Sequence, residues 1–281
     1  MVSTTNGYFF TMKNDIYTVG ALLQPWRQRR RLSQLTLANE ANISQRHLSF
    51  VESGRSVPSR EMILHLAERL EIPIRERNTL FIAAGFAPVY PSRTLDDPAL
   101  EAARGALELI LAGHEPNPVI AVDRQWTLVI ANRAASILLE GVTPMLLEPP
   151  LNVLRASLHP EGLAPRIVNY GEWRAHVVSR LMHQVEVTAD TQLAALLDEI
   201  RSFPAPPGNN SFNANHADSL LEIAIPLQLR TEHGTLSFIS TTTVFGTAVD
   251  LTLSELTIES FLPADHFTSL YLREHCEPNN Y

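Results

Sequence analysis

The sequence predicts an all-α N-terminal domain of five helices, followed by an α+β domain in which helices cover an antiparallel sheet. The chain has 281 residues, which is long for one compact domain. Apolar residues follow a helical period up to residue 86, and short β-type runs begin after residue 117. Residues 88–98 (PVYPSRTLDDP) are rich in proline and are typical of a linker. We therefore expect domains at 14–88 and 98–275, with a linker at 89–97.

Cap and stop residues define the helices of the first domain. Ser33, Ser44 and Ser59 each precede an apolar periodic run, where a side-chain oxygen can cap the first amides. Gly54 follows the third run, at a position that favours a left-handed backbone. The five helices are expected at residues 19–31, 34–41, 45–53, 61–72 and 76–86.

In the second domain, stretches with helical spacing of apolar residues alternate with short β-type runs. A helix over 99–113 precedes the runs NPVIAVD and WTLVIAN, which form a hairpin around a two- or three-residue turn at Arg124-Gln125. Residues 203–218 are poor in apolar side chains and predict a long loop. We expect helices on one face of the sheet. Further helices are expected near residues 133–141, 150–157, 170–187 and 191–203, and strands within 219–230, 234–246 and 253–263.

Charge is distributed unevenly between the two parts. Residues 1–92 contain 11 Lys and Arg against 7 Asp and Glu, a balance of +4, whereas residues 93–281 contain 11 against 23, a balance of −12. Salt screens charges beyond about 8 Å, so a basic first domain can meet a polyanion despite the net charge of −8. Cys276 is the single cysteine, and the sequence shows neither a signal peptide nor an apolar run long enough to span a membrane. We therefore expect a cytoplasmic protein without membrane insertion.

The pair of helices at 34–41 and 45–53 has the layout of a helix-turn-helix. In such a pair the second helix enters the major groove of double-stranded DNA, and proteins of this type usually act as dimers. The first domain resembles the Xre/Cro/C1 family of repressors over residues 19–73. The resemblance depends on Ser33-Gln34, Leu37-Ala38, Ile43-Ser44, Leu48-Ser49, Val51-Glu52-Ser53-Gly54-Arg55 and Pro58-Ser59.

This resemblance implies the DNA contacts. Gln34 and Arg55 would bind backbone phosphate, and the groove would be met by Ser44, Gln45, Arg46, Ser49 and Phe50. Arginines between residues 27 and 55 would together neutralise about five phosphates. Two alternatives stay open: Arg46 and Arg55 are solvated surface charges, or Phe50 belongs to the core. Glu52 is expected to tie the second helix to its neighbours.

The second domain resembles the ligand-binding domain of MmyB-like regulators, which is PAS-like, over residues 98–274. The residues that carry this resemblance are Pro118, Val122-Asp123, Trp126, Asn132-Arg133-Ala134-Ala135, Leu158-His159-Pro160-Glu161-Gly162, Trp173-Arg174 and Leu270. The resemblance implies a small apolar or amphiphilic ligand, similar to a fatty acid, between the sheet and its helices.

Candidate ligand contacts follow from this implied site. The tail would lie among Ile120, Leu128, Val177 and Leu181. A carboxylate head would pair with an arginine, for which Arg133, Arg174 and Arg180 are candidates, although a surface salt bridge is the alternative for each. Polar or aromatic residues near them in sequence are Asn132, His159 and Trp173.

Neither a catalytic site nor a metal site is predicted. The sequence lacks HExxH, CxxC and GxSxG motifs and a phosphate-binding glycine loop. His176 and His183 are seven residues apart, about 10.5 Å along a helix, which is too far to share a metal ion. We expect no cofactor beyond a possible bound lipid. Two alternatives remain: a second domain that docks or dimerises with a protein partner, and an acyl-converting enzyme with an autoregulatory head.

Overall fold

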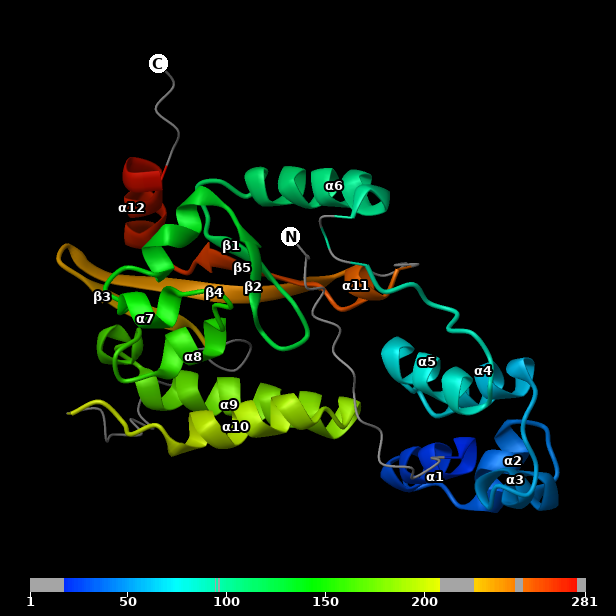
Figure 1. Cartoon of the computed structure of the whole chain (residues 1–281). Coiled ribbons are helices and arrows are strands. Elements are labelled where there is room, and N and C mark those ends of the chain that lie inside the picture. Colours follow the sequence, from blue (N-terminus) through cyan, green and yellow to red (C-terminus); the bar gives the residue numbers. More distant parts are fainter. Residues whose placement is uncertain (1–17, 94, 96, 208–224, 246–249, 277–281) are drawn as a thin grey trace, which may run out of the picture. The chain divides into compact units, whose positions relative to one another are not determined.

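A computed structural model of the protein describes residues 18–93, 95, 97–207, 225–245 and 250–276. Its internal contacts divide the chain into two compact units, Met1–Pro91 and Ser92–Tyr281. The boundary falls inside the proline-rich segment 89–97. Figure 1 labels the elements of both units.

The first unit is helical, as the sequence predicts. Thr18, Ser33, Ser44 and Ser59 each accept a hydrogen bond from an amide of the first turn that follows them. Asn42 (φ +51°) and Gly54 (φ +73°) take left-handed conformations that end α2 and α3. The helices in its described part are α1 (Val19–Arg29), α2 (Gln34–Glu40), α3 (Gln45–Glu52), α4 (Arg60–Arg69) and α5 (Ile74–Ala83).

The core of this unit fixes how α3 packs. Leu48 and Val51 on α3 are fully buried in a cluster to which all five helices contribute. Gly20 on α1 packs directly on the end of α3, because a Cβ atom there would come within 2.1 Å of the Val51 carbonyl oxygen. The opposite side of α3 is left exposed.

The second unit contains helices of various lengths around one sheet. Its longest described helix, α9 (Tyr170–Thr188), contacts α10 (Thr191–Ser202) extensively. The other helical elements described are η1 (Pro98–Leu100), α6 (Glu101–Ala112), η2 (Arg133–Leu138), α7 (Pro144–Leu147), α8 (Val153–Leu158), η3 (Ala164–Arg166), α11 (Leu251–Ser254) and α12 (His266–Cys276).

In the described part of this unit, five antiparallel strands form one sheet in the order β2-β1-β5-β4-β3. The strands are β1 (Val119–Val122), β2 (Leu128–Ala131), β3 (Leu227–Thr231), β4 (Gly234–Val244) and β5 (Thr257–Pro263). The hairpin near the start of the unit therefore joins the sheet through β5, more than 120 residues later in the chain. This confirms the predicted α+β class with an antiparallel sheet.

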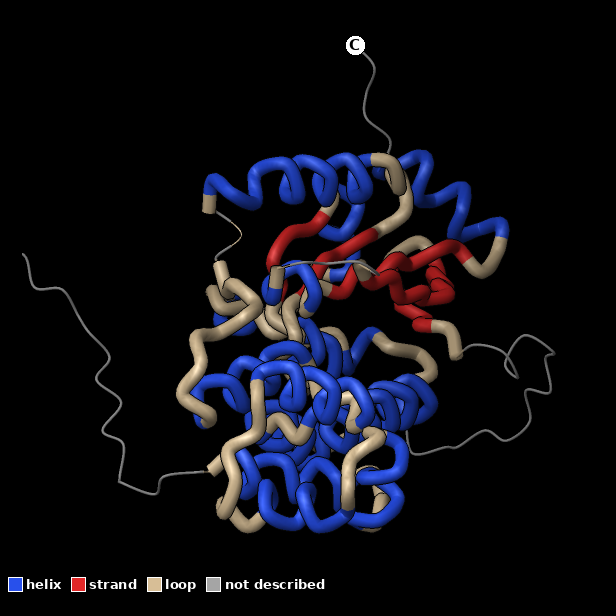
Figure 2. Tube along the Cα trace, turned by 90° about the vertical axis from the view of Figure 1, so that its right-hand side faces the viewer, coloured by secondary structure: helices blue, strands red, loops and turns tan. Residues whose placement is uncertain are grey.

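Helices lie on both faces of the sheet, which corrects the expectation of one covered face. Val119 and Ala121 of β1 pack against α6 through Leu107 and Leu111. The alternate residues of β1, including Ile120, belong to the larger cluster with α8, α9 and α10. Figures 1 and 2 show the strands between these helical layers. Both faces of β1 are apolar, so both need a cover.

Three local predictions differ from the structure. The β1–β2 connection has five residues instead of two or three, because the Asp123 side chain accepts hydrogen bonds from the amides of Gln125 and Thr127, both at 2.8 Å. The segment after Asn132 is a 3₁₀-helix, η2. Helix α12 and the short helical elements α7, η3 and α11 were not anticipated. Most of the expected 203–218 loop, and the start of the strand expected within 219–230, lie outside the described residues.

Candidate functional site

The outer side of α3 carries the side chains predicted to meet DNA. Ser44, Gln45 and Arg46 are exposed at the start of the helix, and Ser49 and Phe50 are half-buried one turn later. Ser44 also caps α3, since its Oγ accepts from the His47 amide at 3.1 Å. The structure therefore brings these five residues to one helix and leaves its N-terminal turn open to solvent.

Phe50 organises two arginines on this surface. The guanidinium carbon of Arg46 lies 5.3 Å from the centre of the Phe50 ring, and that of Arg55 lies 5.8 Å from it. Contacts of this kind between a cation and an aromatic ring are attractive. Phe50 is not among the residues of the hydrophobic cluster of this unit. The ring thus places two positive charges near the exposed turn and the residues after α3.

Glu52 holds α3 to the rest of the unit, as expected. It accepts hydrogen bonds from Arg27 Nε at 2.6 Å and Nη2 at 2.9 Å, and from Gln34 Nε2 at 2.7 Å. The Arg27 and Glu52 side chains are only 10% and 4% exposed. The bonds to Glu52 raise the pKa of the Arg27 guanidinium above its ordinary value.

These bonds change the list of arginines that can reach DNA. Arg27 is buried in its pair with Glu52. Arg30 donates to the carbonyl oxygens of Leu70 and Glu71. Gln34, assigned to phosphate on the resemblance, donates its side-chain amide to Glu52 and is half-buried. The exposed arginines on the described part of residues 27–55 are Arg29, Arg31, Arg46 and Arg55. The expectation of about five neutralised phosphates stays a prediction, for which these four exposed arginines are available.

The second unit contains an apolar cavity of about 90 Å³ between the sheet and the helices α8 and α9. Its polar lining groups lie on Ser157, His176, Arg180 and Glu259. The rest of the lining consists of Ile120, Trp126, Leu128, Ala131, Ala135, Leu138, Leu139, Val153, Leu154, Ala156, Leu163, Trp173, Val177, Leu227 and Phe261. A largely apolar cavity with a few polar groups is typical of a small-molecule site.

Half of the predicted ligand residues line this cavity. Ile120 and Leu128 come from the sheet, and Trp173, Val177 and Arg180 come from α9. Leu181, one turn after Val177, is fully buried in the core cluster and is absent from the lining.

The other four predicted residues have partners outside the cavity. Asn132 caps η2 and binds the backbone of β1, and Arg133 donates to the Cys276 carbonyl oxygen. His159 packs edge-on against Phe203, with 5.0 Å between ring centroids. Arg174 donates to the Arg201 carbonyl oxygen at 2.8 Å. These contacts support the surrounding fold.

The sequence did not single out several lining residues as ligand contacts. Trp126 reaches the cavity because it has a left-handed backbone (φ +64°) and because its indole N–H donates to Gln184 on α9 at 2.7 Å. Glu259 lies within a largely apolar strand. A carboxylate in such a strand was the sequence feature that could have identified it as a residue of the ligand site. Ser157 accepts from the Trp173 indole at 3.1 Å. Burial and the charge of Arg180 lower the pKa of His176.

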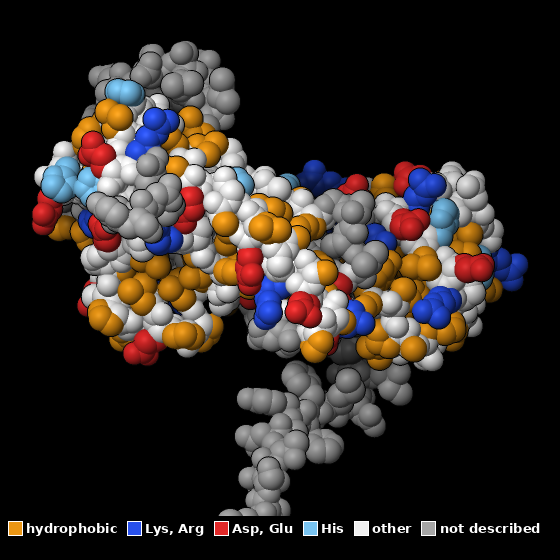
Figure 3. Space-filling model, turned by 90° about the horizontal axis from the view of Figure 1, so that it is seen from above, with side chains coloured by type: hydrophobic (Ala, Val, Ile, Leu, Met, Phe, Trp, Pro, Cys, Tyr) orange, Lys and Arg blue, Asp and Glu red, His pale blue; other side chains and the backbone are white. Residues whose placement is uncertain are grey.

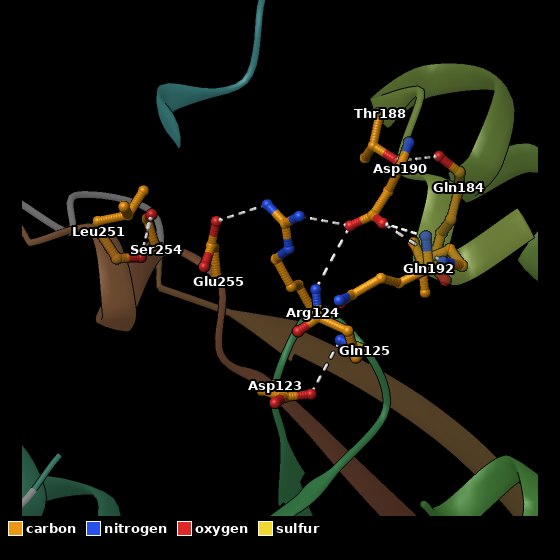
Figure 4. Close-up of polar contacts among 11 residues, drawn as sticks. Asp123, Arg124, Gln125, Gln184, Thr188, Asp190, Gln192, Leu251, Ser254 and Glu255 are labelled. Carbon is orange, nitrogen blue, oxygen red and sulfur yellow. Dashed lines mark hydrogen bonds and ion pairs between the residues drawn. The ribbon is translucent and has the colours of Figure 1, made fainter. Parts of the chain in front are cut away.

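A polar network beside the cavity connects three elements (Figure 4). Arg124, two residues before Trp126, lies 2.5 Å from Asp190 at the start of α10 and 3.4 Å from Glu255 after α11. Asp190 also accepts from the Gln192 amide at 2.8 Å. The β1–β2 loop, the α9–α10 junction and the α11–β5 connection therefore share one cluster of charges.

Both ends of the segment between the units are held by side chains. The buried Asn78 on α5 accepts from the amides of Val89 and Tyr90 and donates to the Tyr90 carbonyl. Arg93 Nη1 donates to Asp250, at the start of α11, at 2.8 Å. The chain thus enters the second unit beside α11, the short helix that directly precedes Glu255.

The described residues offer no group of three or more His, Cys, Asp or Glu side chains suited to a metal ion. No described helix has the length and apolar character needed to cross a bilayer. On the face drawn in Figure 3, acidic and basic side chains are interspersed with hydrophobic ones.

Two family models match the chain. Residues 18–80 match a helix-turn-helix domain, and residues 103–274, more than half of the chain, match the MmyB-like transcription regulator ligand binding domain. The chain belongs to the MmyB-like transcription regulator family. The helix-turn-helix match covers α1 to α4 and most of α5, and the MmyB-like match covers the cavity, so both predicted resemblances are confirmed.

No curated protein matches this MmyB-like regulator. Among solved structures, the clp gene regulator ClgR from Corynebacterium glutamicum is similar to it at 24% identity, over 36% of this chain and 94% of that one, with a TM-score of 0.22.

Proposed function

We propose that the protein is a one-component bacterial transcription regulator, in which the first unit binds a specific DNA sequence as part of a homodimer. A small apolar or amphiphilic ligand in the second unit controls this binding. The observation that carries the proposal is the apolar cavity, with its few polar groups, in the same chain as an open recognition helix. A cytoplasmic location, where DNA is accessible, belongs to the same proposal.

The DNA-binding step is assigned to α3 and the residues after it. Arg46 pairs with a guanine edge, Gln45 with adenine, and Phe50 contacts a thymine methyl group. Ser44, Ser49 and Gln34 contribute hydrogen bonds near the groove, and Arg55 binds phosphate. With about four arginines neutralising phosphates, the logarithm of the binding constant falls against the logarithm of salt concentration with a slope of about −4. A slope near zero contradicts the assignment.

The ligand-binding step is assigned to the cavity lining. Each buried methylene of a ligand contributes about 0.8 kcal/mol, so an acyl chain suits Ile120, Leu128 and Val177 chemically. The volume is restrictive, because an engineered cavity of about 150 Å³ is the size that accommodates benzene. We propose that the part of the ligand held between the sheet and α9 is compact. A long fatty-acid chain requires the cavity to widen.

The network around Arg124 supplies a route from the cavity to the DNA-binding unit. Trp126 lines the cavity, and Arg124 in the same loop pairs with Glu255. Glu255 directly follows α11, and Asp250 at the start of α11 accepts a hydrogen bond from Arg93. Movement of Trp126 on ligand binding changes the position of this loop. The change then reaches α11 and the segment that leads to the first unit.

The deciding experiment measures operator binding by the full-length chain before and after extraction of bound small molecules. Mass spectrometry of the extract identifies what co-purifies. We expect an apolar compound whose return changes the operator affinity. A co-purifying protein without such a compound favours a docking or dimerising role for the second unit, and turnover of an acyl compound favours an enzyme.

A further inference from the structure

Two charged side chains of opposite sign, Arg180 and Glu259, form a pair in the cavity lining, and the part of the cavity beside this pair is called its polar end. Among the described residues that line the cavity, the ionisable groups near this end are His176 and Arg180 on α9 and Glu259 on β5. Glu259 is only 3% exposed. A carboxylate buried to this extent needs a partner, because removing its charge from water is costly.

Arg180 is that partner, and both of its terminal nitrogens donate hydrogen bonds. Its Nη1 donates to Glu259 Oε2 at 3.0 Å, and its Nη2 donates to Glu259 Oε1. Thr242 on β4 accepts from Nη2 at 2.8 Å and donates to Glu259 Oε1 at 3.0 Å. The guanidinium carbon lies 4.6 Å from the centre of the Trp126 ring. The pair is bidentate and is held in place by Thr242 and Trp126.

The charges at this end of the cavity cancel. Glu259 contributes one negative charge and Arg180 one positive charge. Burial and the neighbouring Arg180 lower the pKa of His176, so its imidazole is neutral at pH 7. The other candidate arginines do not compensate a further anion here, since Arg133 and Arg174 donate to backbone carbonyls outside the cavity.

A ligand carboxylate at this end would therefore lack a counter-charge. It would share Arg180 with Glu259, or displace Glu259 and leave a buried carboxylate unpaired. An uncharged donor avoids both problems. A carboxylate offers about four acceptor sites, and the described donors to Glu259 are Nη1 and Nη2 of Arg180 and the Thr242 hydroxyl. One site remains for a ligand O–H.

We propose that the cavity selects a compact apolar alcohol over the carboxylate of the same chain length, and that Glu259 is the residue that determines this specificity. The inference depends on the proposed ligand-binding function and specifies the chemistry of its ligand. Arg180 is a positioning residue for Glu259, which itself accepts from the ligand hydroxyl.

The test uses probes that differ only in their head group. Ethanol, propanol and butanol, which suit the restricted volume, are titrated into the full-length, lipid-extracted chain at pH 7.5 alongside acetate, propionate and butyrate, with calorimetric measurement of Kd. We expect each alcohol to bind about tenfold more tightly than its carboxylate, the factor that corresponds to one weakly screened, uncompensated charge.

Glu259→Gln gives the sharper test. This variant keeps the shape of the side chain and leaves Arg180 uncompensated, so we expect the preference to reverse in favour of the carboxylates. Glu199→Gln is the matched control, because it neutralises the carboxylate of another Arg–Glu pair, with Arg155, outside the cavity lining. The control should keep the wild-type ratio. If Glu259→Gln does not fold, the double variant Arg180→Met/Glu259→Gln removes both charges and should keep the preference for alcohols.

Each outcome has a distinct meaning. Tighter binding of carboxylates by the wild-type chain, an unchanged ratio in Glu259→Gln, or reversal in the double variant overturns the inference and leaves ligand control intact. Binding of a long-chain fatty acid without binding of any alcohol does the same. If no probe binds and no extracted compound changes operator affinity, the inference and the proposed function both fail.

Discussion

Glu52→Gln should destabilise the first unit more than any exposed charge change. The substitution preserves volume but leaves the Arg27 guanidinium, 10% exposed, without its counter-charge. Removing one partner of a buried ion pair typically costs about 3–5 kcal/mol. For a domain of this size each kcal/mol corresponds to about 4–8 °C in Tm. The unfolding temperature of the first unit should therefore fall by about 12 °C or more.

Calorimetry of the full-length chain is the assay, and the transition of the first unit is the one that operator DNA raises. Glu71→Gln is the control within the same unit, because Glu71 is 80% exposed and lies 3.8 Å from Arg30. Such exposed pairs contribute little, so Tm should stay unchanged. The double variant Arg27→Met/Glu52→Leu should recover most of the loss, since apolar replacement of a buried pair is often neutral or stabilising. A fall below about 3 °C for Glu52→Gln, or no recovery in the double variant, refutes the reasoning.

Three further outcomes are expected. Arg46→Ala should cost about 1–3 kcal/mol at the preferred operator and relax one base position, whereas Arg55→Ala should weaken all sequences alike; equal losses on every sequence in a binding-site selection would make Arg46 a phosphate contact. Burial and Arg180 lower the pKa of His176 in the folded chain, so on acidification the unfolded chain protonates His176 at a higher pH than the folded chain does. The stability that depends on a neutral His176 is therefore present above about pH 6.5 and is lost as the pH falls. Melting of His176→Gln from about pH 8 to 5.5 should show a flatter curve than the wild type, and an equally steep one refutes the role of His176. Arg93→Ala should keep both operator and ligand affinity but reduce the effect of ligand on operator binding, and an unchanged effect excludes the α11 route.

The sequence was sufficient for the local structure of the first unit. Ser33, Ser44 and Ser59 cap helices, and Gly54 ends α3, because these effects depend on neighbours within a few residues. The exposed side of α3 follows from its helical period for the same reason.

Whether an individual polar residue is buried or exposed could not be predicted from its neighbours in the sequence. Arg27 and Arg46 look alike in sequence, yet one is buried against Glu52 and the other is exposed. Likewise Arg133, Arg174 and Arg180 were equivalent candidates, and only Arg180 lines the cavity. Whether an arginine turns inward depends on a partner that is distant in the chain.

The sequence by itself determined the order of the domains, the order and the serine caps of the helices in the first unit, the apolar surplus of the second domain and the family. Only the tertiary structure decided that β1 pairs with β5, that Trp126 enters the cavity and that Glu259 neutralises Arg180. The physical reason is range. Caps and helical periods act over a few residues, whereas the β1–β5 pairing and the Arg180–Glu259 pair join residues 79 or more positions apart, whose meeting depends on the packing of the whole unit.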